Sequence, residues 1–470
     1  MNGETANYRL ESDMLGDLKI PNNAYYGIHT ARAIENFPVS GKAVNRHLIN
    51  AMVIVKKAAL KAHKNLEHIP SNLLDASVRA CDEILSGSLL DNFVVDSLQG
   101  GAGTSTNMNV NEVIANRAIE LLGGSKGDYS VVHPLHHINC CQSTNDVYPT
   151  ALRIAAIGLL RLLSQSLASL QESLQKKERE FSDVLMLGRT QLMDALPMMA
   201  GQGFGAYARA VSRDRWRLYK AEERLREVNI GGTAIGTGMN AEKAYIFRVI
   251  EILRELTGFG LARSEFSMDN TQNMDVFVEV SGLLKAAAAT LSKISSDLRL
   301  LASGPLGGIS ELILPAVQAG SSIMPGKVNP VIPEMVNQAA IKVMANDAAI
   351  TISAMSGQLQ LNAFSPLIAE SLLESIEIMT RAVVIFEKKC IEKIQINEER
   401  CRENVCRSSS LATALVHHIG YEKASHAALK AVSEGKTIYE VMKEDGSLPD
   451  ETLDKILNPY EITRPGIPGK

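Results

Sequence analysis

The 470-residue sequence lacks an excess of charge of either sign. It has 48 lysines and arginines against 52 aspartates and glutamates, which gives a net charge of -4 at neutral pH. A strongly basic balance is typical of proteins that bind nucleic acid or an anionic membrane surface. The composition therefore argues against both partners, and a small anionic ligand would need local positive charge.

Cysteine is scarce, and its spacing is not that of a metal site. The six cysteines are Cys81, Cys140, Cys141, Cys390, Cys401 and Cys406. There is no Cys-x-x-Cys pair and no paired histidine pattern, so the sequence predicts neither a zinc site nor a disulfide framework. We expect reduced thiols, and we expect the adjacent Cys140 and Cys141 to be packing residues rather than a redox pair.

An apolar leader and a long uninterrupted apolar run are also missing. Residues 1–11 are polar and lack the apolar core of a signal peptide. The longest apolar stretches are interrupted by Arg, Lys or Ser well before the ~20 residues that a membrane-spanning helix needs. We therefore expect a soluble, cytoplasmic protein with no membrane partner.

The sequence does contain a series of long segments with apolar residues at helical spacing. They cover residues 48–66, 150–183, 198–228, 241–256, 271–301, 332–355 and 366–394. Helices of about thirty residues are about 45 Å long, which suits a helical bundle rather than a small core. Their wide apolar faces predict a bundle that also buries surface against other subunits. The expected fold class is mainly α.

The chain is too long for one ordinary hydrophobic core, so we expect several domains. Residues 1–142 are predicted to form an N-terminal mixed, mostly helical domain, and residues 143–396 a central helical bundle domain. Residues 397–470 are predicted to form a small, more polar C-terminal domain, in which Gly435 and Gly446 mark breaks.

Residues 320–330 combine reactive side chains with residues that bend the backbone. Gly320 and Gly326 permit backbone angles closed to other residues, and Pro325 and Pro330 fix φ, so the segment is predicted to be a loop. The loop carries two hydroxyls, one ammonium and one amide, on Ser321, Ser322, Lys327 and Asn329. A loop of this kind can close over a substrate. The alternative is a mobile surface turn.

A glycine-rich turn lies at residues 99–109 and leads into an amphipathic helix. Free N–H groups in such a turn could hold an anion at the helix start. A dinucleotide-binding fingerprint would need a third glycine three residues after Gly103, where Thr106 stands, and this disfavours that alternative. The polar side chains of the turn, including Thr104, are therefore of more interest than its glycines.

Two more polar segments precede predicted long helices. Residues 143–146 read Ser-Thr-Asn-Asp, before Pro149 and a helix expected from Thr150, and residues 189–191 read Arg-Thr-Gln in a predicted loop. Each could be an ordinary helix cap. Taken with the 320–330 loop, they would supply neutral hydrogen-bond donors and one fixed cation, a combination that predicts a metal-free site for two carboxylates.

The same segments resemble those of the aspartase/fumarase superfamily. Residues 320–330 match its signature loop, and residues 100–109, 143–146, 189–197 and 231–240 match its other segments. The resemblance extends over essentially the whole chain. It implies the three-domain fold of this superfamily, with a central long-helix bundle that assembles into a homotetramer and with active sites shared between three subunits.

Within the superfamily, the chain resembles the aspartase branch more than the fumarase branch. Fumarases carry a histidine at the position of Gln191 and a glutamate at the position of Gln318, an ionisable pair suited to handling water. Both are neutral amides here. Residues 24–30 and 357–362 also look like the aspartase versions. Leu306 departs from the pattern, because relatives usually have arginine there, and it bears on subunit packing more than on chemistry.

The resemblance implies reversible anti elimination of ammonia from L-aspartate, giving fumarate through an aci-carboxylate intermediate, with no cofactor and no metal. Ser321 is the implied base. The implied substrate-binding residues are Thr104, Ser143, Thr144, Asn145, Thr190, Gln191, Ser322, Lys327 and Asn329. Two alternatives stay open. One is fumarate hydratase, with water as the leaving group; the other is a non-catalytic structural homologue, whose mark would be loss of the loop serine or lysine.

Overall fold

The computed structural model describes residues 7–64, 66 and 69–470, so the first six residues of the polar N-terminal segment lie outside the described residues. The chain divides into two compact units. Unit 1 comprises residues 1–164, 216–286 and 341–379, and unit 2 comprises residues 165–215, 287–340 and 380–470. The division into three domains after residues 142 and 396 stays a prediction.

The N-terminal part of unit 1 combines a small hairpin with short helices. These elements are β1 (Tyr8–Asp13), β2 (Gly16–Pro21), α1 (Ile28–Asn36), α2 (Arg46–His63), α3 (Ser71–Leu85) and α4 (Thr104–Leu121). Glu112 of α4 is fully buried and accepts hydrogen bonds from the backbone N–H groups of Gly27 and His29 at the start of α1. Burial raises the pKa of Glu112 to about 7. The carboxyl group thus satisfies helix donors that would otherwise have no intrahelical partner.

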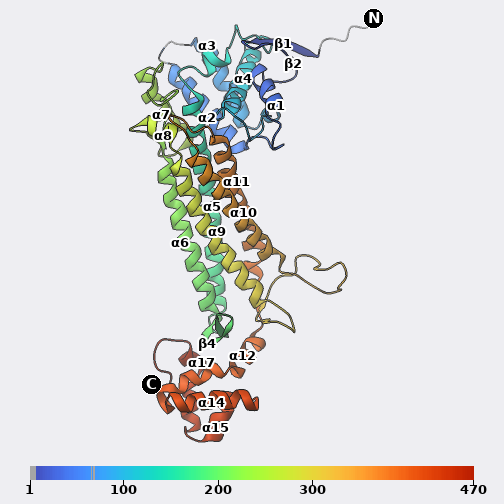
Figure 1. Ribbon diagram of the computed structural model, residues 1–470, viewed down its shortest axis with the longest axis vertical. Coiled ribbons are helices and arrows are strands. Elements are labelled where there is room, and N and C mark those ends of the chain that lie inside the picture. Colours follow the sequence, from blue (N-terminus) through green and yellow to red (C-terminus); the bar gives the residue numbers. More distant parts are fainter. Residues whose placement is uncertain (1–6, 65, 67–68) are drawn as a thin grey trace. The chain divides into compact units, whose positions relative to one another are not determined.

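Long helices form the bundle that the apolar spacing predicts (Figure 1). They are α5 (Thr144–Glu180), α6 (Ala200–Leu225), α9 (Asp275–Leu301), α10 (Val331–Met355) and α11 (Ser365–Lys389). Polar links join neighbouring helices inside each unit. In unit 1, Ser281 of α9 donates to Asp347 of α10 at 2.8 Å, and in unit 2, Ser169 of α5 donates to Glu387 of α11 at 2.6 Å. The mainly α fold class is confirmed.

The start of α5 differs from the prediction. The helix begins at Thr144 and contains Pro149, whereas the proline suggested a start near Thr150. Proline cannot donate to the carbonyl four residues earlier, which is that of Asn145. Asn229 replaces the missing donor, because its Nδ2 donates to the Asn145 carbonyl at 3.1 Å. A distant side chain therefore lets the helix start early and places Thr144 and Asn145 in its first turn.

By length and composition alone, α5 could cross a membrane, which corrects the expectation that no apolar stretch is long enough. However, 61% of its most apolar 18-residue window is buried inside the structure. Its apolar residues include Ile157, Leu160 and Leu163, all almost completely buried. This is the pattern of a core helix.

Two more predictions need correction. Residues 185–199 form a hairpin of β3 (Leu185–Thr190) and β4 (Met193–Met199), where a loop was predicted around residues 189–191. The predicted helix over residues 271–301 is interrupted, since α8 (Ser267–Gln272) ends before α9 begins. The other predicted helices end within a few residues of the observed ones, which include α7 (Lys243–Thr257).

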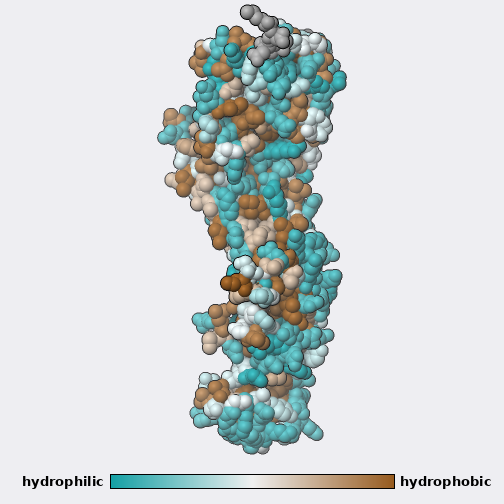
Figure 2. Space-filling model, turned by 90° about the vertical axis from the view of Figure 1, so that its right-hand side faces the viewer, coloured by the Kyte–Doolittle hydropathy of each residue, from teal (hydrophilic) through white to brown (hydrophobic). Residues whose placement is uncertain are grey.

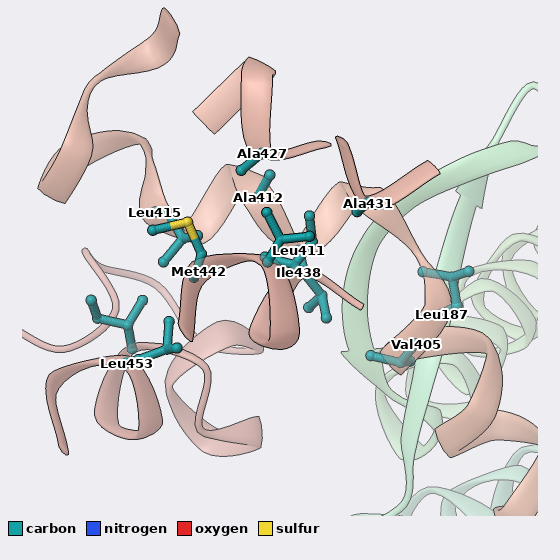
Figure 3. Packing of buried hydrophobic residues seen from close by; sticks show 12 residues of the cluster. Leu187, Val405, Leu411, Ala412, Leu415, Ala427, Ala431, Ile438, Met442 and Leu453 are labelled. Carbon is teal, nitrogen blue, oxygen red and sulfur yellow. The ribbon is translucent and has the colours of Figure 1, made fainter. Parts of the chain in front are cut away.

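The C-terminal part of unit 2 packs short helices around its own apolar cluster (Figure 3). The helices are α12 (Glu398–Arg407), α13 (Val416–Ile419), α14 (Tyr421–Glu434), α15 (Ile438–Asp445), α16 (Asp450–Ile456) and α17 (Pro459–Ile462). Leu415, Ile438 and Leu453 are completely buried in this cluster. Gly435 and Gly446 end α14 and α15 in the left-handed region, as the sequence predicts.

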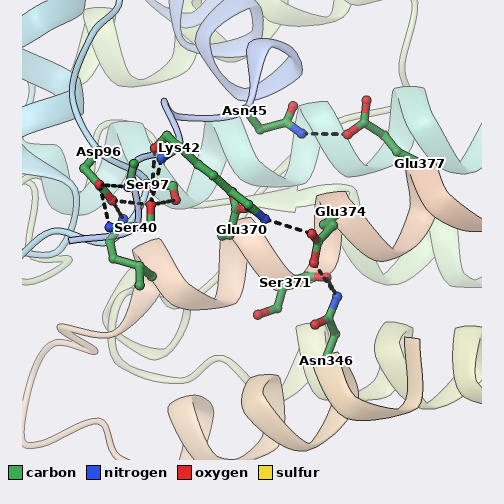
Figure 4. Close-up of polar contacts among 12 residues, drawn as sticks. Ser40, Lys42, Asn45, Asp96, Ser97, Asn346, Glu370, Ser371, Glu374 and Glu377 are labelled. Carbon is green, nitrogen blue, oxygen red and sulfur yellow. Dashed lines mark hydrogen bonds and ion pairs between the residues drawn. The ribbon is translucent and has the colours of Figure 1, made fainter. Parts of the chain in front are cut away.

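Unit 1 also contains a polar cluster on the first half of α11 (Figure 4). Glu374 pairs with Lys42 at 3.1 Å and accepts a hydrogen bond from Asn346 of α10 at 3.0 Å. Partial burial raises the pKa of Glu374, but hydrogen bonds from Lys342, Asn346 and Lys42 outweigh it and lower that pKa to about 2. The cluster attaches the loop before α2 to two bundle helices.

Candidate active site

The loop at residues 320–330 contains neither helix nor strand, as predicted. Its two ends are joined by backbone and side-chain hydrogen bonds. The Gly320 N–H donates to the Lys327 carbonyl at 2.7 Å, and Asn329 Nδ2 donates to the Gly320 carbonyl at 2.7 Å. A Cβ on Gly320 would lie 2.4 Å from the Lys327 carbonyl oxygen. Only glycine therefore permits this close approach of the two ends.

Ser321 occupies a defined position at the start of this loop. Its Oγ accepts hydrogen bonds from the backbone N–H groups of Ile323 at 3.1 Å and Met324 at 2.9 Å. Two backbone donors aimed at one hydroxyl oxygen stabilise negative charge on that oxygen. This is the environment that a serine needs if its oxygen is to accept a proton from carbon.

Lys327 and Asn329 line a cleft of about 790 Å³ within unit 2. The opposite side of the cleft comes from the end of α9 and the segment after it, including Arg299 and Ser303. Ser322 and Lys327 are exposed, whereas Ser321 and Asn329 are half-buried. The loop therefore presents an accessible ammonium group beside a partly shielded serine.

Thr190 and Gln191 lie at the tip of the β3–β4 hairpin. Gln191 and Leu192 both have positive φ, at 54° and 65°, which is the geometry of a two-residue type I′ turn. Thr190 and Gln191 are exposed. The preceding Arg189 makes two hydrogen bonds to the fully buried Glu311, at 2.7 and 2.9 Å, and this pair fixes the end of β3.

In unit 1, Ser143, Thr144 and Asn145 lie at the start of α5. Ser143 Oγ accepts the N–H of Asn145 at 3.2 Å, so part of its role is the helix cap that the sequence left open. Asn145 Nδ2 donates to the Ala234 carbonyl at 2.8 Å. The segment is thus held in place by the loop that follows residue 229.

Asp146 ties the same loop to the start of α5. Its buried carboxyl group accepts N–H groups from Ser143 at 3.0 Å, Gly231 at 3.1 Å and Thr233 at 2.9 Å. Burial raises the pKa of Asp146 to about 6. It acts on Ser143 through its backbone N–H and is a positioning residue.

Thr104 begins α4 and is exposed, as expected for a residue after a glycine-rich turn. Its hydroxyl donates to the Gly101 carbonyl at 2.8 Å. The turn lies directly on α5, because a Cβ on Gly103 would be 2.1 Å from the ring of Tyr148. One predicted anion donor is already used, since the Thr106 N–H donates to Gln99 Oε1.

A buried polar network beneath Thr144 was not predicted. Thr144 Oγ1 accepts from Asn107 Nδ2, which also contacts Asn139 Oδ1, both at 3.1 Å. Lys56 is fully buried and donates to Asn139 Oδ1 at 2.8 Å and Gln142 Oε1 at 2.9 Å. The one hint in the sequence was that Lys56 stands among the apolar residues of α2. The network holds the start of α5 in place through its hydrogen bond to Thr144.

Lys56 gives a testable pH dependence. Burial lowers its pKa to about 7 from the ordinary 10.5. Between these values the unfolded chain holds a proton that the folded chain lacks, so stability rises with pH in this window. We expect the free energy of unfolding to rise between pH 7 and 8.5 by about 1–2 kcal/mol more in the native protein than in Lys56→Met. Urea unfolding at several pH values measures this.

The matched control for Lys56→Met is Lys61→Met, an exposed lysine on the same helix. It should follow the native pH profile. Equal pH slopes for the native protein and Lys56→Met would contradict a neutral buried lysine.

The predicted site residues thus fall into two groups. Thr104, Ser143, Thr144 and Asn145 belong to unit 1, and Thr190, Gln191, Ser321, Ser322, Lys327 and Asn329 belong to unit 2. The first group converges on the start of α5 through Tyr148 and Asn107. The prediction that segments of both groups from neighbouring subunits form one active site is not tested by the single chain.

Comparison with known proteins identifies the family. A lyase family model matches residues 16–345, and a model of the fumarase C C-terminus matches residues 411–464. The chain is 46% identical to an aspartate ammonia-lyase from Bacillus sp over 98% of this chain and 99% of the relative. It is 48% identical to the aspartate ammonia-lyase of Pseudomonas fluorescens over 98% of this chain and 97% of the relative. The chain belongs to the aspartase/fumarase superfamily.

A solved structure agrees with this assignment. The fumarate lyase:delta crystallin from Brucella melitensis bound to cobalt matches with a TM-score of 0.95 and 47% identity, covering 97% of this chain and 100% of that one. The superfamily resemblance stated from residues 100–109, 143–146 and 320–330 is therefore confirmed. The individual roles of the site residues stay predictions.

Proposed function

We propose that this superfamily member is an aspartate ammonia-lyase, a carbon–nitrogen lyase that eliminates ammonia from L-aspartate to give fumarate. The observation that carries the proposal is near full-length identity of 46–48% to relatives named aspartate ammonia-lyase. The neutral amides Gln191 and Gln318, where fumarases carry an ionisable pair, support it. So does the retention of both Ser321 and Lys327, which disfavours a non-catalytic homologue.

The difficult step is removal of a proton from the β-carbon. The neighbouring β-carboxylate must accept the charge as a dianionic aci-carboxylate, so the site has to bind that form best. Ser321 in its alkoxide form takes the proton, and the N–H groups of Ile323 and Met324 stabilise the alkoxide before the transfer. The C–N bond then breaks with its electron pair going to nitrogen, so that the ammonium group leaves as ammonia. The electron pair held by the aci-carboxylate forms the double bond of fumarate.

The remaining predicted residues bind the charges of the substrate. Lys327 and Asn329, with Thr190, hold the α-carboxylate. The hydroxyls of Thr104, Ser143, Thr144 and Ser322 bond to the oxygens of the aci-carboxylate. Asn145 and Gln191, with Thr104, surround the departing amine. The N-terminus of α5 adds favourable dipole potential for the dianion, because Thr144 and Asn145 form its first turn.

The assignment of Lys327 predicts a binding defect. Lys327→Met removes a charged hydrogen-bond donor to a carboxylate, which contributes about 1.5–3 kcal/mol. We expect KM for L-aspartate to rise about 10- to 100-fold, with a smaller change in kcat. Steady-state kinetics measure both, and Lys423→Met, an exposed lysine elsewhere in unit 2, is the control. An unchanged KM would remove Lys327 from the carboxylate site.

We also propose a homotetramer whose active sites combine segments from three chains. Apolar surface interrupts the hydrophilic surface on the face shown in Figure 2. On α10, the exposed apolar side chains of Ile341, Ile352 and Met355 lie on one face of the helix. Leu306 is also 93% exposed. Light scattering should give a particle mass equal to four chains. We also propose that the enzyme is cytoplasmic.

The nearest alternative is fumarate hydratase, and product identity separates the two functions. The enzyme is incubated with fumarate, with and without ammonium, and the products are identified by mass spectrometry. The proposal predicts L-aspartate only when ammonium is present. Formation of malate without ammonium would establish the hydratase instead.

A further inference from the structure

A histidine and two cysteines that are far apart in sequence meet in unit 1. His63 ends α2, and Cys140 and Cys141 lie just before Ser143 and the start of α5. Each offers one ligand atom, and these three atoms all lie within 4.8 Å of one another. His63 is buried, whereas the cysteines are half-buried and so can be reached from solvent. None of the three has a role in the proposed elimination.

We propose that His63, Cys140 and Cys141 form a binding site for a thiophilic divalent cation such as Zn²⁺. Two thiolates and one imidazole are the ligands that zinc prefers, and they disfavour Mg²⁺ and Ca²⁺, which take oxygen ligands. Three protein ligands leave the fourth tetrahedral position for water or a small molecule.

The separation of the two sulfur atoms fits this assignment. Cys140 Sγ and Cys141 Sγ are 3.9 Å apart. With zinc–sulfur bonds of about 2.3 Å, two thiolates on a tetrahedral ion are about 3.8 Å apart. A disulfide fits less well, because adjacent Cα atoms are about 3.8 Å apart and disulfides usually need about 4.4–6.8 Å.

The surroundings of His63 also suit a metal ligand. Its Nε2 lies 3.2 Å from the carbonyl oxygen of Cys140. A carbonyl can only accept, so Nε2 carries the proton, and coordination through Nδ1 is compatible with this bond. Metal-bound histidines usually donate their second N–H to such an oxygen, which fixes the ring. The ring of Tyr245 stacks on the imidazole at a centroid distance of 4.7 Å.

The sequence spacing concealed this arrangement. The expectation of no zinc site was based on local cysteine and histidine patterns, whereas His63 lies 77 positions before Cys140. Folding of α2 against the segment before α5 brings them together. The site is distinct from the predicted substrate residues, but Cys141 is only two positions from Ser143.

Cobalt and zinc binding to the reduced full-length protein test the proposal. The chelated protein is titrated with Co²⁺ in the absence of oxygen. We expect thiolate-to-cobalt charge transfer in the near ultraviolet and the visible bands of tetrahedral cobalt. Zn²⁺ should displace the bound Co²⁺, so that these bands disappear once about one zinc ion per chain has been added. Absence of charge transfer would overturn the proposal.

Matched variants locate the site. The double variant Cys140→Ser/Cys141→Ser should lose the charge-transfer band, and the single variants Cys141→Ser and His63→Gln should weaken Co²⁺ binding by more than about tenfold. Cys406→Ser, which removes an exposed cysteine elsewhere, should bind as the native protein does. Circular dichroism checks the folding of each variant, and the single variants serve if the double variant does not fold.

Two further results would contradict the assignment. One is a charge-transfer band that persists in Cys140→Ser/Cys141→Ser but disappears in Cys406→Ser. The other is a loss of two hydrogens from the peptide containing Cys140 and Cys141 in protein purified without reductant, because this would show that the pair forms a disulfide instead.

Discussion

Ser321→Ala is expected to lower kcat for L-aspartate by about 10³-fold or more, the upper range for loss of a general base. The hydroxyl oxygen of Ser321 accepts hydrogen bonds from two backbone N–H groups. Alanine has no atom at that position that could accept a proton. Steady-state measurement of fumarate formation gives the rate. Comparable turnover in the variant would remove Ser321 as the base.

The loss in Ser321→Ala must be separated from collapse of the loop. Calorimetric binding of succinate, an unreactive dicarboxylate, provides the test, because the carboxylate-binding residues Lys327 and Asn329 remain. We expect the affinity for succinate to change by less than about tenfold. Ser322→Ala, at the neighbouring hydroxyl, should mainly raise KM, since Ser322 is predicted to bind substrate and not to take the proton.

Glu311→Ala is expected to destabilise the protein by about 3–5 kcal/mol, the cost of breaking a buried ion pair from one side. Glu311 is completely buried and accepts two hydrogen bonds from Arg189 and one from Asn404 at 2.8 Å. Alanine would leave the Arg189 guanidinium without its carboxylate in a largely buried position. Chemical denaturation followed by circular dichroism measures the loss.

Two comparison variants make the Glu311 prediction specific. Glu311→Gln keeps the size and one acceptor oxygen, so it should cost less than Glu311→Ala. Glu403→Ala breaks an exposed pair with Arg400 at 3.4 Å and should cost no more than about 1 kcal/mol. If Glu311→Ala and Glu403→Ala lose the same stability, the buried pair does not anchor the β3–β4 hairpin.

The long helices could be predicted from the sequence because their apolar residues repeat along one face. The start of α5 could not, since Pro149 suggested a break that the distant Asn229 repairs. The β3–β4 hairpin escaped prediction because Gln191 and Leu192 adopt left-handed backbone angles without the usual glycine or asparagine. The local sequence therefore predicts a helix or strand correctly only where contacts with distant residues do not change the backbone.

The candidate site divides in the same way. Glycine and proline spacing was sufficient to predict the 320–330 loop, and the donors to Ser321 come from the same loop. Lys56 and Asn107 support Thr144 from other helices, so no local pattern around Thr144 contained them. Likewise, His63 and the two cysteines become neighbours only after folding.

The central claim, ammonia elimination from L-aspartate, is tested most directly by adding L-aspartate to the purified protein and following the ultraviolet absorbance of fumarate. We predict a steady rise in absorbance with release of an equal amount of ammonia, and almost no rise with Ser321→Ala. An enzyme that folds, assembles and binds succinate but forms no fumarate from L-aspartate would contradict the account.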